Sequence, residues 1–240
     1  MKYAAAFTLF TVLLGFLALR LGGAWLLLLW PAASFSLVAL AYGGVGPRLL
    51  GKQPDGRMRP WAVLVLLPYL LFTWATWHLA RVLSREPAHA EVVPGVLVGR
   101  RLLSGELPAG VGTVLDLTAE FIEPAGIRRA ARYVSLPILD ASTLPVGRVA
   151  PVLRELATLP GPVYVHCAQG HGRTGMIAAA LLVARGDAPD AKTALALIQR
   201  VRPGVRVSPA QAHALDELAE ALGVPVSGGT APTLGGVTTR

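Results

Sequence analysis

The sequence has only one cysteine, Cys167, among its 240 residues. A single cysteine forms neither an internal disulfide framework nor a CxxC metal site, which excludes a disulfide-rich secreted scaffold. Charged residues are also scarce, at 15% of the chain, whereas an ordinary soluble protein carries about 25%. Because 53% of the residues are hydrophobic and the mean hydropathy is +0.54, we do not expect an ordinary soluble protein.

The few charges are unevenly placed along the chain. Residues 1–90 hold eight Lys/Arg and two Asp/Glu, whereas residues 91–240 hold fourteen and twelve. The basic excess therefore lies beside the most apolar segments, as it does in membrane proteins with basic loops. A nucleic-acid-binding protein needs a basic stripe on its folded surface instead. We expect membrane lipid, and no nucleic acid, among the partners.

Three N-terminal stretches lack charge for long enough to cross a bilayer core, which takes about 20 apolar residues. They predict transmembrane helices at about residues 3–20, 24–45 and 61–81, within a membrane region of residues 1–85. Gly22-Gly23 predicts a tight hairpin between the first two helices.

A cleaved signal peptide is the alternative for residues 1–23, since Lys2 precedes an apolar run. No A-x-A cleavage site follows it, however, and two further apolar stretches would remain after cleavage. The sequence therefore predicts a multi-pass integral membrane protein.

From residue 91 onward, short β-branched runs alternate with helical patterns. Strands are expected at residues 91–99, 112–117, 133–136 and 162–166, and helices at 146–159, 173–185, 189–201 and from Ser208 onward. This alternation predicts an α/β domain over residues 91–222. The Gly/Thr/Pro-rich tail, residues 223–240, is expected to be disordered.

The stretch most informative about chemistry is HCAQGHGRTG, residues 166–175. An apolar strand ends at Cys167, a glycine-rich loop follows, and Arg173 begins a helix. Backbone N–H groups of such a loop, together with the positive end of the helix, form an anion-binding nest. Arg173 supplies a planar fork for two phosphate oxygens, and a cysteine in such a nest becomes a nucleophilic thiolate. Taken singly, the two residues could be a buried inert thiol and a solvated helix start, but their spacing argues against both.

This pattern, Cys-x5-Arg-Thr preceded by His at the end of a strand, resembles the signature of the cysteine-dependent protein tyrosine phosphatase superfamily. The short domain is similar to the dual-specificity branch. The resemblance extends upstream to PGVLVG at residues 94–99 and downstream to VRPG at 201–204 and to Ser208-Pro209 with Gln211. It covers residues 91–222, leaves out the three N-terminal stretches, and implies a central, mostly parallel sheet flanked by helices.

The resemblance also implies roles for the residues of the motif. Cys167 would be the nucleophile, Thr174 would stabilise the thiolate as a leaving group, and His166 would support the loop. Whether His171 faces the substrate or the solvent stays open. The phosphate-binding loop would consist of Ala168, Gln169, Gly170, His171, Gly172 and Arg173.

A general acid is needed to protonate the departing oxygen. The family places an aspartate on a mobile loop about thirty residues before the cysteine, and Asp140, 27 positions before Cys167, occupies that place. The alternative is that Asp140 is an ordinary loop aspartate with no role in catalysis. Asp116 is the reserve candidate, with helix capping as its expected role.

The implied reaction is the hydrolysis of phosphate monoesters through a cysteinyl-phosphate intermediate, with no metal or organic cofactor. Phosphotyrosine, phosphoserine or phosphothreonine proteins are the expected substrates. The alternative is a phospholipid monophosphate of the phosphatidylglycerophosphate or phosphoinositide type, because few residues separate the third apolar stretch from the domain. The loop lacks the lysines of phosphoinositide-selective relatives. A non-catalytic phosphate-binding module is the minor alternative, and the oligomeric state is left open.

Two arguments about membrane topology conflict. The positive-inside rule places the basic loop at residues 43–60 in the cytoplasm, and three spans would then put the C-terminal domain outside. Thiol chemistry and phosphoprotein substrates favour the cytoplasm for that domain. We expect the domain to be cytoplasmic.

Overall fold

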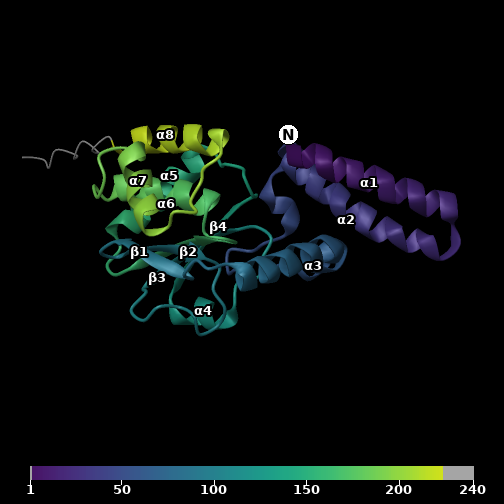
Figure 1. Cartoon of the computed structure of the whole chain (residues 1–240), viewed down its shortest axis with the longest axis horizontal. Helices are drawn as coiled ribbons and strands as arrows, with labels where there is room; N and C mark the ends of the chain where they lie inside the picture. The colour runs from purple at the N-terminus through teal and green to yellow at the C-terminus, as the bar shows by residue number, and fades with distance from the viewer. Residues whose placement is uncertain (1, 224–240) are drawn as a thin grey trace, which may run out of the picture.

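The computed structural model describes residues 2–223, in which apolar helices precede an α/β domain (Figure 1). The helices long and apolar enough to cross a membrane are α1 (Lys2–Leu21), the helical segment Gly23–Val45, and α3 (Pro60–Leu83). The middle segment contains α2 (Leu29–Leu40) as its α-helical part, and a short 3₁₀ turn, Pro47–Leu50, follows it. The predicted hairpin is confirmed, because Gly22 and Gly23 both adopt positive φ values between α1 and the second segment.

The C-terminal domain, residues 89–223, is built on a five-stranded sheet. Its strands are β1 (His89–Val93), β2 (Val96–Arg100), β3 (Thr113–Thr118), β4 (Arg132–Ile138) and β5 (Val163–Cys167). They lie in the order β1-β2-β5-β3-β4, and every neighbouring pair is parallel except β1 with β2. The expected mostly parallel sheet is therefore confirmed. The stretch expected as one strand, residues 91–99, belongs to a hairpin, because Gly95 turns the chain at a φ of 83°.

Helices cover both faces of this sheet, with α4 on one side and the others on the opposite side (Figure 1). The helices of the domain are α4 (Ala125–Ala130), α5 (Val146–Thr158), α6 (Gly172–Ala184), α7 (Ala191–Val201) and α8 (Pro209–Gly223). The central helix, α6, is buried over most of its length. It continues directly from the glycine-rich loop that follows Cys167. The short α4 was not expected, since its six residues are too few to show an apolar period.

The predicted start of the last helix is confirmed in detail. The Ser208 hydroxyl accepts a hydrogen bond from the Gln211 backbone N–H, and the Gln211 side chain accepts one from the Ser208 N–H. This reciprocal pair is a capping box. The expected disordered tail, apart from Gly223, lies outside the described residues.

The N-terminal helices pack against the domain through one apolar cluster. Its members come from the second helical segment, the following loop, α3 and two loops of the domain: Val38, Ala41, Leu50, Met58, Ala62, Leu66, Tyr69, Leu70, Ala119 and Leu139. Among residues 2–223, every large hydrophobic residue with an exposed side chain, except Val201, lies between Tyr3 and Leu83. The exposed apolar surface of the described chain is thus concentrated on these helices.

Candidate active site

The loop after β5 is shaped by a close approach to β2. Gly170 has a φ of 75°, and a Cβ there would lie 2.3 Å from the carbonyl carbon of Gly99. A side chain at position 170 would therefore meet both backbone strain and a direct clash. The loop closes at Gly172, where α6 begins, so the positive end of that helix points into the loop.

A buried arginine that the sequence did not reveal as functional holds the loop from behind. Arg202 Nε donates to the Gly170 carbonyl at 2.9 Å, and its Nη2 donates to the Gln169 carbonyl at 2.9 Å. With both carbonyls turned toward Arg202, they are held away from a bound anion. In the sequence, the only sign of this residue is its place in the VRPG pattern.

His171 is held by a neighbouring carboxylate. Its Nε2 lies 2.8 Å from Glu86 Oε2, and the same carboxylate lies 3.1 Å from Arg202 Nη2. Although partial burial opposes it, these partners lower the pKa of Glu86 below its usual value. His171 also lines the pocket described below, so its ring contacts both Glu86 and the space where a substrate would lie.

Cys167 lies at the bottom of the site and is only 3% exposed. Beneath it, His166 is fully buried, and its Nδ1 lies 3.3 Å from the Cys167 carbonyl oxygen. Burial lowers the pKa of His166 to about 4, against a smaller opposing effect of Asp116. A neutral ring cannot act as the cation of the site, which agrees with the supporting role that the family resemblance implies. Thr174 is also fully buried, with no partner for Oγ1 among residues 2–223.

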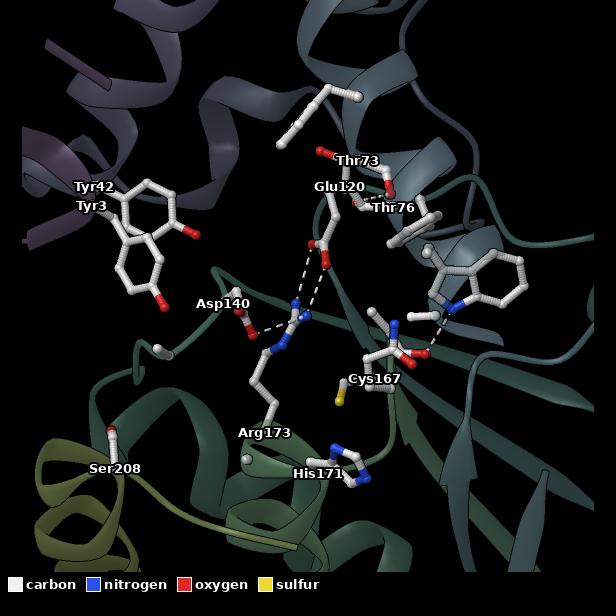
Figure 2. A pocket seen from close by; sticks show the side chains of 18 of the residues that line it. Tyr3, Tyr42, Thr73, Thr76, Glu120, Asp140, Cys167, His171, Arg173 and Ser208 are labelled. Carbon is white, nitrogen blue, oxygen red and sulfur yellow. Dashed lines mark hydrogen bonds and ion pairs between the residues drawn. The ribbon is translucent and has the colours of Figure 1, made fainter. Parts of the chain in front are cut away.

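Arg173 lies under a carboxylate that the sequence did not reveal. Its Nη1 and Nη2 lie 3.1 and 2.8 Å from the two oxygens of Glu120, and Nη1 also donates to the Ile138 carbonyl at 2.9 Å (Figure 2). Burial lowers the pKa of Arg173, but Glu120 outweighs this effect and raises it well above its usual value. Within the described chain the buried Nε has no partner. Glu120 thus fixes the plane of the guanidinium and leaves Nε available for an anion.

Asp140 is a second carboxylate beside the guanidinium of Arg173, and it lies near the same Nη2 that contacts Glu120. Its Oδ1 is 3.3 Å from Arg173 Nη2, and its side chain is 63% exposed at the rim of the site (Figure 2). Ala141 beside it has a φ of 53°, a conformation uncommon for a non-glycine residue. The structure therefore brings together Asp140, Cys167 and Arg173, the three residues that the predicted chemistry requires.

Asp116, the reserve candidate, does not line the pocket. It lies within β3 and is fully buried, so its expected role as a helix cap is wrong. Its Oδ2 lies 2.5 Å from Lys52 Nζ and accepts a hydrogen bond from the Tyr133 hydroxyl at 2.7 Å. Despite burial, the Lys52 charge holds the pKa of Asp116 well below its usual range.

One side-chain cluster under the site has the composition of a metal site. The ligand atoms of Asp116, Glu123 and His166 lie within 4.8 Å of one another. The Lys52 ammonium already contacts Asp116, however, and would repel a cation placed there. Burial, reinforced by Asp116, raises the pKa of Glu123 to about 8. The cluster is better described as the buried Lys52–Asp116 ion pair with Glu123 and His166 beside it.

The pocket above Cys167 has a volume of about 590 Å³, and its two walls differ in chemistry. The polar floor comes from the loop after β5 and from Glu120, Asp140, Arg206, Ser208 and Gln211. The other wall comes from the N-terminal helices: Tyr3, Phe7, Tyr42, Tyr69, Phe72, Thr73, Thr76, Trp77 and Ala80. Figure 2 shows Tyr3 and Tyr42 on one side of Arg173, and Thr73 and Thr76 beyond Glu120.

Comparisons with known proteins identify the family and the fold of the domain. A family model described as the Swiss Army Knife protein, DSP-PTPase phosphatase domain, matches residues 100–215. No curated protein sequence matches the chain.

Solved structures of phosphatases share the fold. A mouse protein described as a putative dual specificity phosphatase, solved with zinc tungstate, has a TM-score of 0.50 at 18% identity and covers 58% of this chain and 91% of its own. A human DUSP28 structure has a TM-score of 0.50 at 20% identity and covers 57% and 97%. PTPMT1 in complex with PI(5)P has a TM-score of 0.50 at 18% identity and covers 57% and 97%.

Proposed function

Because this chain belongs to the dual-specificity branch of the cysteine-dependent protein tyrosine phosphatase superfamily, and is a phosphatase of that type, we propose that it hydrolyses a phosphate monoester carried by a membrane lipid. The observation that supports a lipid substrate is the mixed lining of the pocket. One cavity is lined both by the Cys167 loop and by an aromatic wall from α1, the second helical segment and α3.

The proposed reaction has two displacement steps. The phosphate binds to the loop amides and to Arg173, and the Cys167 thiolate attacks phosphorus while Asp140 protonates the departing oxygen. A water molecule, deprotonated by Asp140, then attacks the cysteinyl-phosphate, and phosphate leaves with the thiolate restored. The family resemblance assigns the stabilisation of that thiolate to the hydroxyl of Thr174, which follows Arg173 in the chain.

The apolar wall is what favours a lipid over a phosphoprotein. A peptide carrying a phosphorylated side chain needs a cleft bordered by polar groups for its backbone. Here the wall beside the nucleophile is made mostly of rings and aliphatic side chains on helices whose outer surfaces are themselves apolar. An acyl chain would bury apolar surface there at about 25 cal/mol per Å².

The polar floor favours a single phosphate group. Arg173 and the loop amides serve one phosphate, and the interior loop positions Ala168 and Gln169 add no cation for a second. The other guanidinium that lines the pocket, Arg206, already donates to the Pro203 and Val205 carbonyls. A lipid with one terminal phosphate monoester, of the phosphatidylglycerophosphate kind, therefore fits better than a polyphosphorylated inositol lipid.

The proposal is tested by phosphate release from full-length protein in mixed micelles. We expect a phospholipid monophosphate to be hydrolysed with a higher kcat/KM than tyrosine or serine phosphopeptides, and the Cys167→Ser protein to release no phosphate while still binding tungstate. Faster hydrolysis of the peptides would assign the protein to phosphoprotein substrates. Turnover by Cys167→Ser above about one percent would overturn the nucleophile assignment.

A matched pair of variants distinguishes the effect of the pocket wall on substrate binding from that of the exposed apolar surface outside the pocket. Phe72 and Leu71 are adjacent on α3 and both exposed, but only Phe72 lines the pocket. We expect Phe72→Ala to raise KM for the lipid roughly tenfold, equivalent to about 1.4 kcal/mol, without changing hydrolysis of p-nitrophenyl phosphate. Leu71→Ala should change neither. Equal effects of the two substitutions would show that the wall does not contact the substrate.

A further inference from the structure

Helix α3 contacts the C-terminal domain along its second half. Its 24 residues give a length of about 36 Å at 1.5 Å per residue, which exceeds the hydrocarbon core of about 30 Å. Near its end, Trp77 Nε1 donates to the Ala168 carbonyl at 2.8 Å, and Arg81 Nη2 lies 2.7 Å from Glu106 Oε1. Before that, Trp74 Nε1 donates to the Glu120 carbonyl at 3.1 Å.

The segment that precedes α3 is joined to the same domain. Lys52 Nζ lies 2.5 Å from Asp116 Oδ2, with both side chains fully buried. The Glu123 backbone N–H donates to the Gly56 carbonyl at 2.9 Å, and Arg128 donates to the Asp55 carbonyl at 3.3 Å. The loop at residues 51–59 thus lies on the domain immediately before α3 begins.

These contacts are incompatible with α3 as a complete crossing. A helix that spans a bilayer places its preceding loop and its following domain on opposite faces, about 30 Å apart. Here the preceding loop and the following domain bury charged side chains against each other. Figure 1 also shows α1 and α2 projecting as a hairpin whose turn is far from the domain, whereas α3 lies between that hairpin and the domain, with one end at the domain.

We propose that the chain crosses the membrane twice, through α1 and Gly23–Val45, and that α3 lies along the membrane surface beneath the domain. The buried side of α3 includes Ala62, Leu66 and Leu70, which lie in the cluster shared with the second helical segment, the following loop and two loops of the domain. The opposite side meets the lipid through exposed residues outside the pocket: Trp61, Leu64, Leu71, Leu79, Val82 and Leu83. Helix α3 therefore has one side held by other parts of the protein and one apolar side exposed along its length for contact with lipid.

Two crossings also remove the conflict between the positive-inside rule and a cytoplasmic C-terminal domain. The basic residues on the side of the domain are Lys2, Arg48, Lys52, Arg57, Arg59, Arg81 and Arg85, whereas Arg20 lies at the far hairpin. This strong asymmetry places the domain side in the cytoplasm by the positive-inside rule. With three crossings, by contrast, the basic loop and the domain would lie on opposite faces.

The topology is tested with single-cysteine reporters in full-length Cys167→Ser protein, in sealed vesicles of both orientations. The reporters are Arg57→Cys in the loop, His213→Cys in the domain and Ala24→Cys at the hairpin, all at exposed positions. We expect an impermeant maleimide to label the first two in inside-out vesicles and the third in right-side-out vesicles. Labelling of positions 57 and 213 from opposite faces would overturn the proposal.

A cross-link provides a second, independent readout. Cysteines introduced at Asp55 and Arg128, which contact each other in the structure, should be joined by a short bismaleimide within one chain in intact membranes. The control pair, Ala24 with Arg128, should not be joined. If both cysteines of the first pair react singly in detergent but never cross-link in the membrane, the loop and the domain lie apart and the proposal fails.

Discussion

At the scale of single residues, the position of Asp140 determines which substrates depend on it. Its exposed carboxyl lies 3.3 Å from Arg173 Nη2 at the rim of the pocket, where a departing oxygen would leave. We expect Asp140→Asn to reduce kcat on alkyl phosphates by about 10²- to 10⁴-fold, the usual contribution of a general acid. Aryl phosphates with good leaving groups should be affected far less. An unchanged rate on alkyl phosphates would transfer the acid role to another residue.

Glu120 acts through Arg173 and is a positioning residue. Removal of one partner from a buried ion pair costs about 3 to 5 kcal/mol, so Glu120→Gln should lower Tm by many degrees. A bound tungstate ion replaces the missing negative charge, so it should raise the Tm of this variant more than that of the parent. The matched control is Glu155→Gln, which removes a solvent-exposed pair with Arg132 and should change Tm little. Equal tungstate effects in parent and Glu120→Gln would contradict this role.

At the scale of elements, the contact between the 51–59 loop and the domain makes stability depend on pH. Burial raises the pKa of Glu123 from 4.5 to about 8, so the folded protein binds more protons than the unfolded chain between these values. The contribution of Glu123 to stability is therefore complete below pH 4.5 and is lost as the pH rises through 8. We expect Glu123→Gln to leave Tm unchanged near pH 5 and to raise it at pH 9.

A second carboxylate, Glu106, has a pKa shifted in the opposite direction and therefore serves as the control. Although burial opposes it, hydrogen bonds from the Leu103 backbone, Arg81 and Arg100 lower the pKa of Glu106 to about 2. Its stabilisation is present above its ordinary value of 4.5 and is lost as the pH falls toward 2. Glu106→Gln should therefore lower Tm at both pH 5 and pH 9. A Glu123→Gln profile that runs parallel to that of Glu106→Gln would contradict the raised pKa.

The same elements show what the sequence could predict. The strand, loop and helix around Cys167 were predictable because the turn residues, the helix start and the apolar run all lie within about twenty consecutive residues. Glu120 and Lys52 were not, since their partners Arg173 and Asp116 are 53 and 64 positions away. No local period marks such pairs, because only the packing of distant segments brings the two residues of each pair together.

The tertiary contacts of the apolar helices were equally hidden from the sequence. Hydropathy identifies three helices of sufficient length, but hydropathy alone does not distinguish a helix that crosses the bilayer from one that lies on its surface. The distinction for α3 depends on interactions such as that of Trp77 with Ala168. Segment length is a local property, whereas topology depends on where the flanking segments are bound.

At the scale of the whole molecule, the two halves of the chain have separable roles in the proposed activity. The chemistry depends on the C-terminal domain with the 51–59 loop and α3, whereas α1 and the second helical segment supply Tyr3, Phe7 and Tyr42 to the pocket wall. A protein lacking residues 2–45 retains Lys52 opposite Asp116 and the whole of α3. It therefore keeps the groups that bind and transfer phosphate.

We expect this shortened protein, measured in detergent, to hydrolyse p-nitrophenyl phosphate at a rate within a fewfold of the full-length protein. Its kcat/KM for a phospholipid monophosphate should fall at least about tenfold, because each aromatic side chain removed from the wall contributes about 1 kcal/mol or more to binding. On membranes it should be extracted by alkaline carbonate, since α3 alone would hold it at the surface, whereas the full-length protein should resist extraction. Loss of both activities with an unchanged Tm would mean that α1 and α2 shape the phosphate site itself, and resistance to carbonate would mean that α3 is inserted across the bilayer.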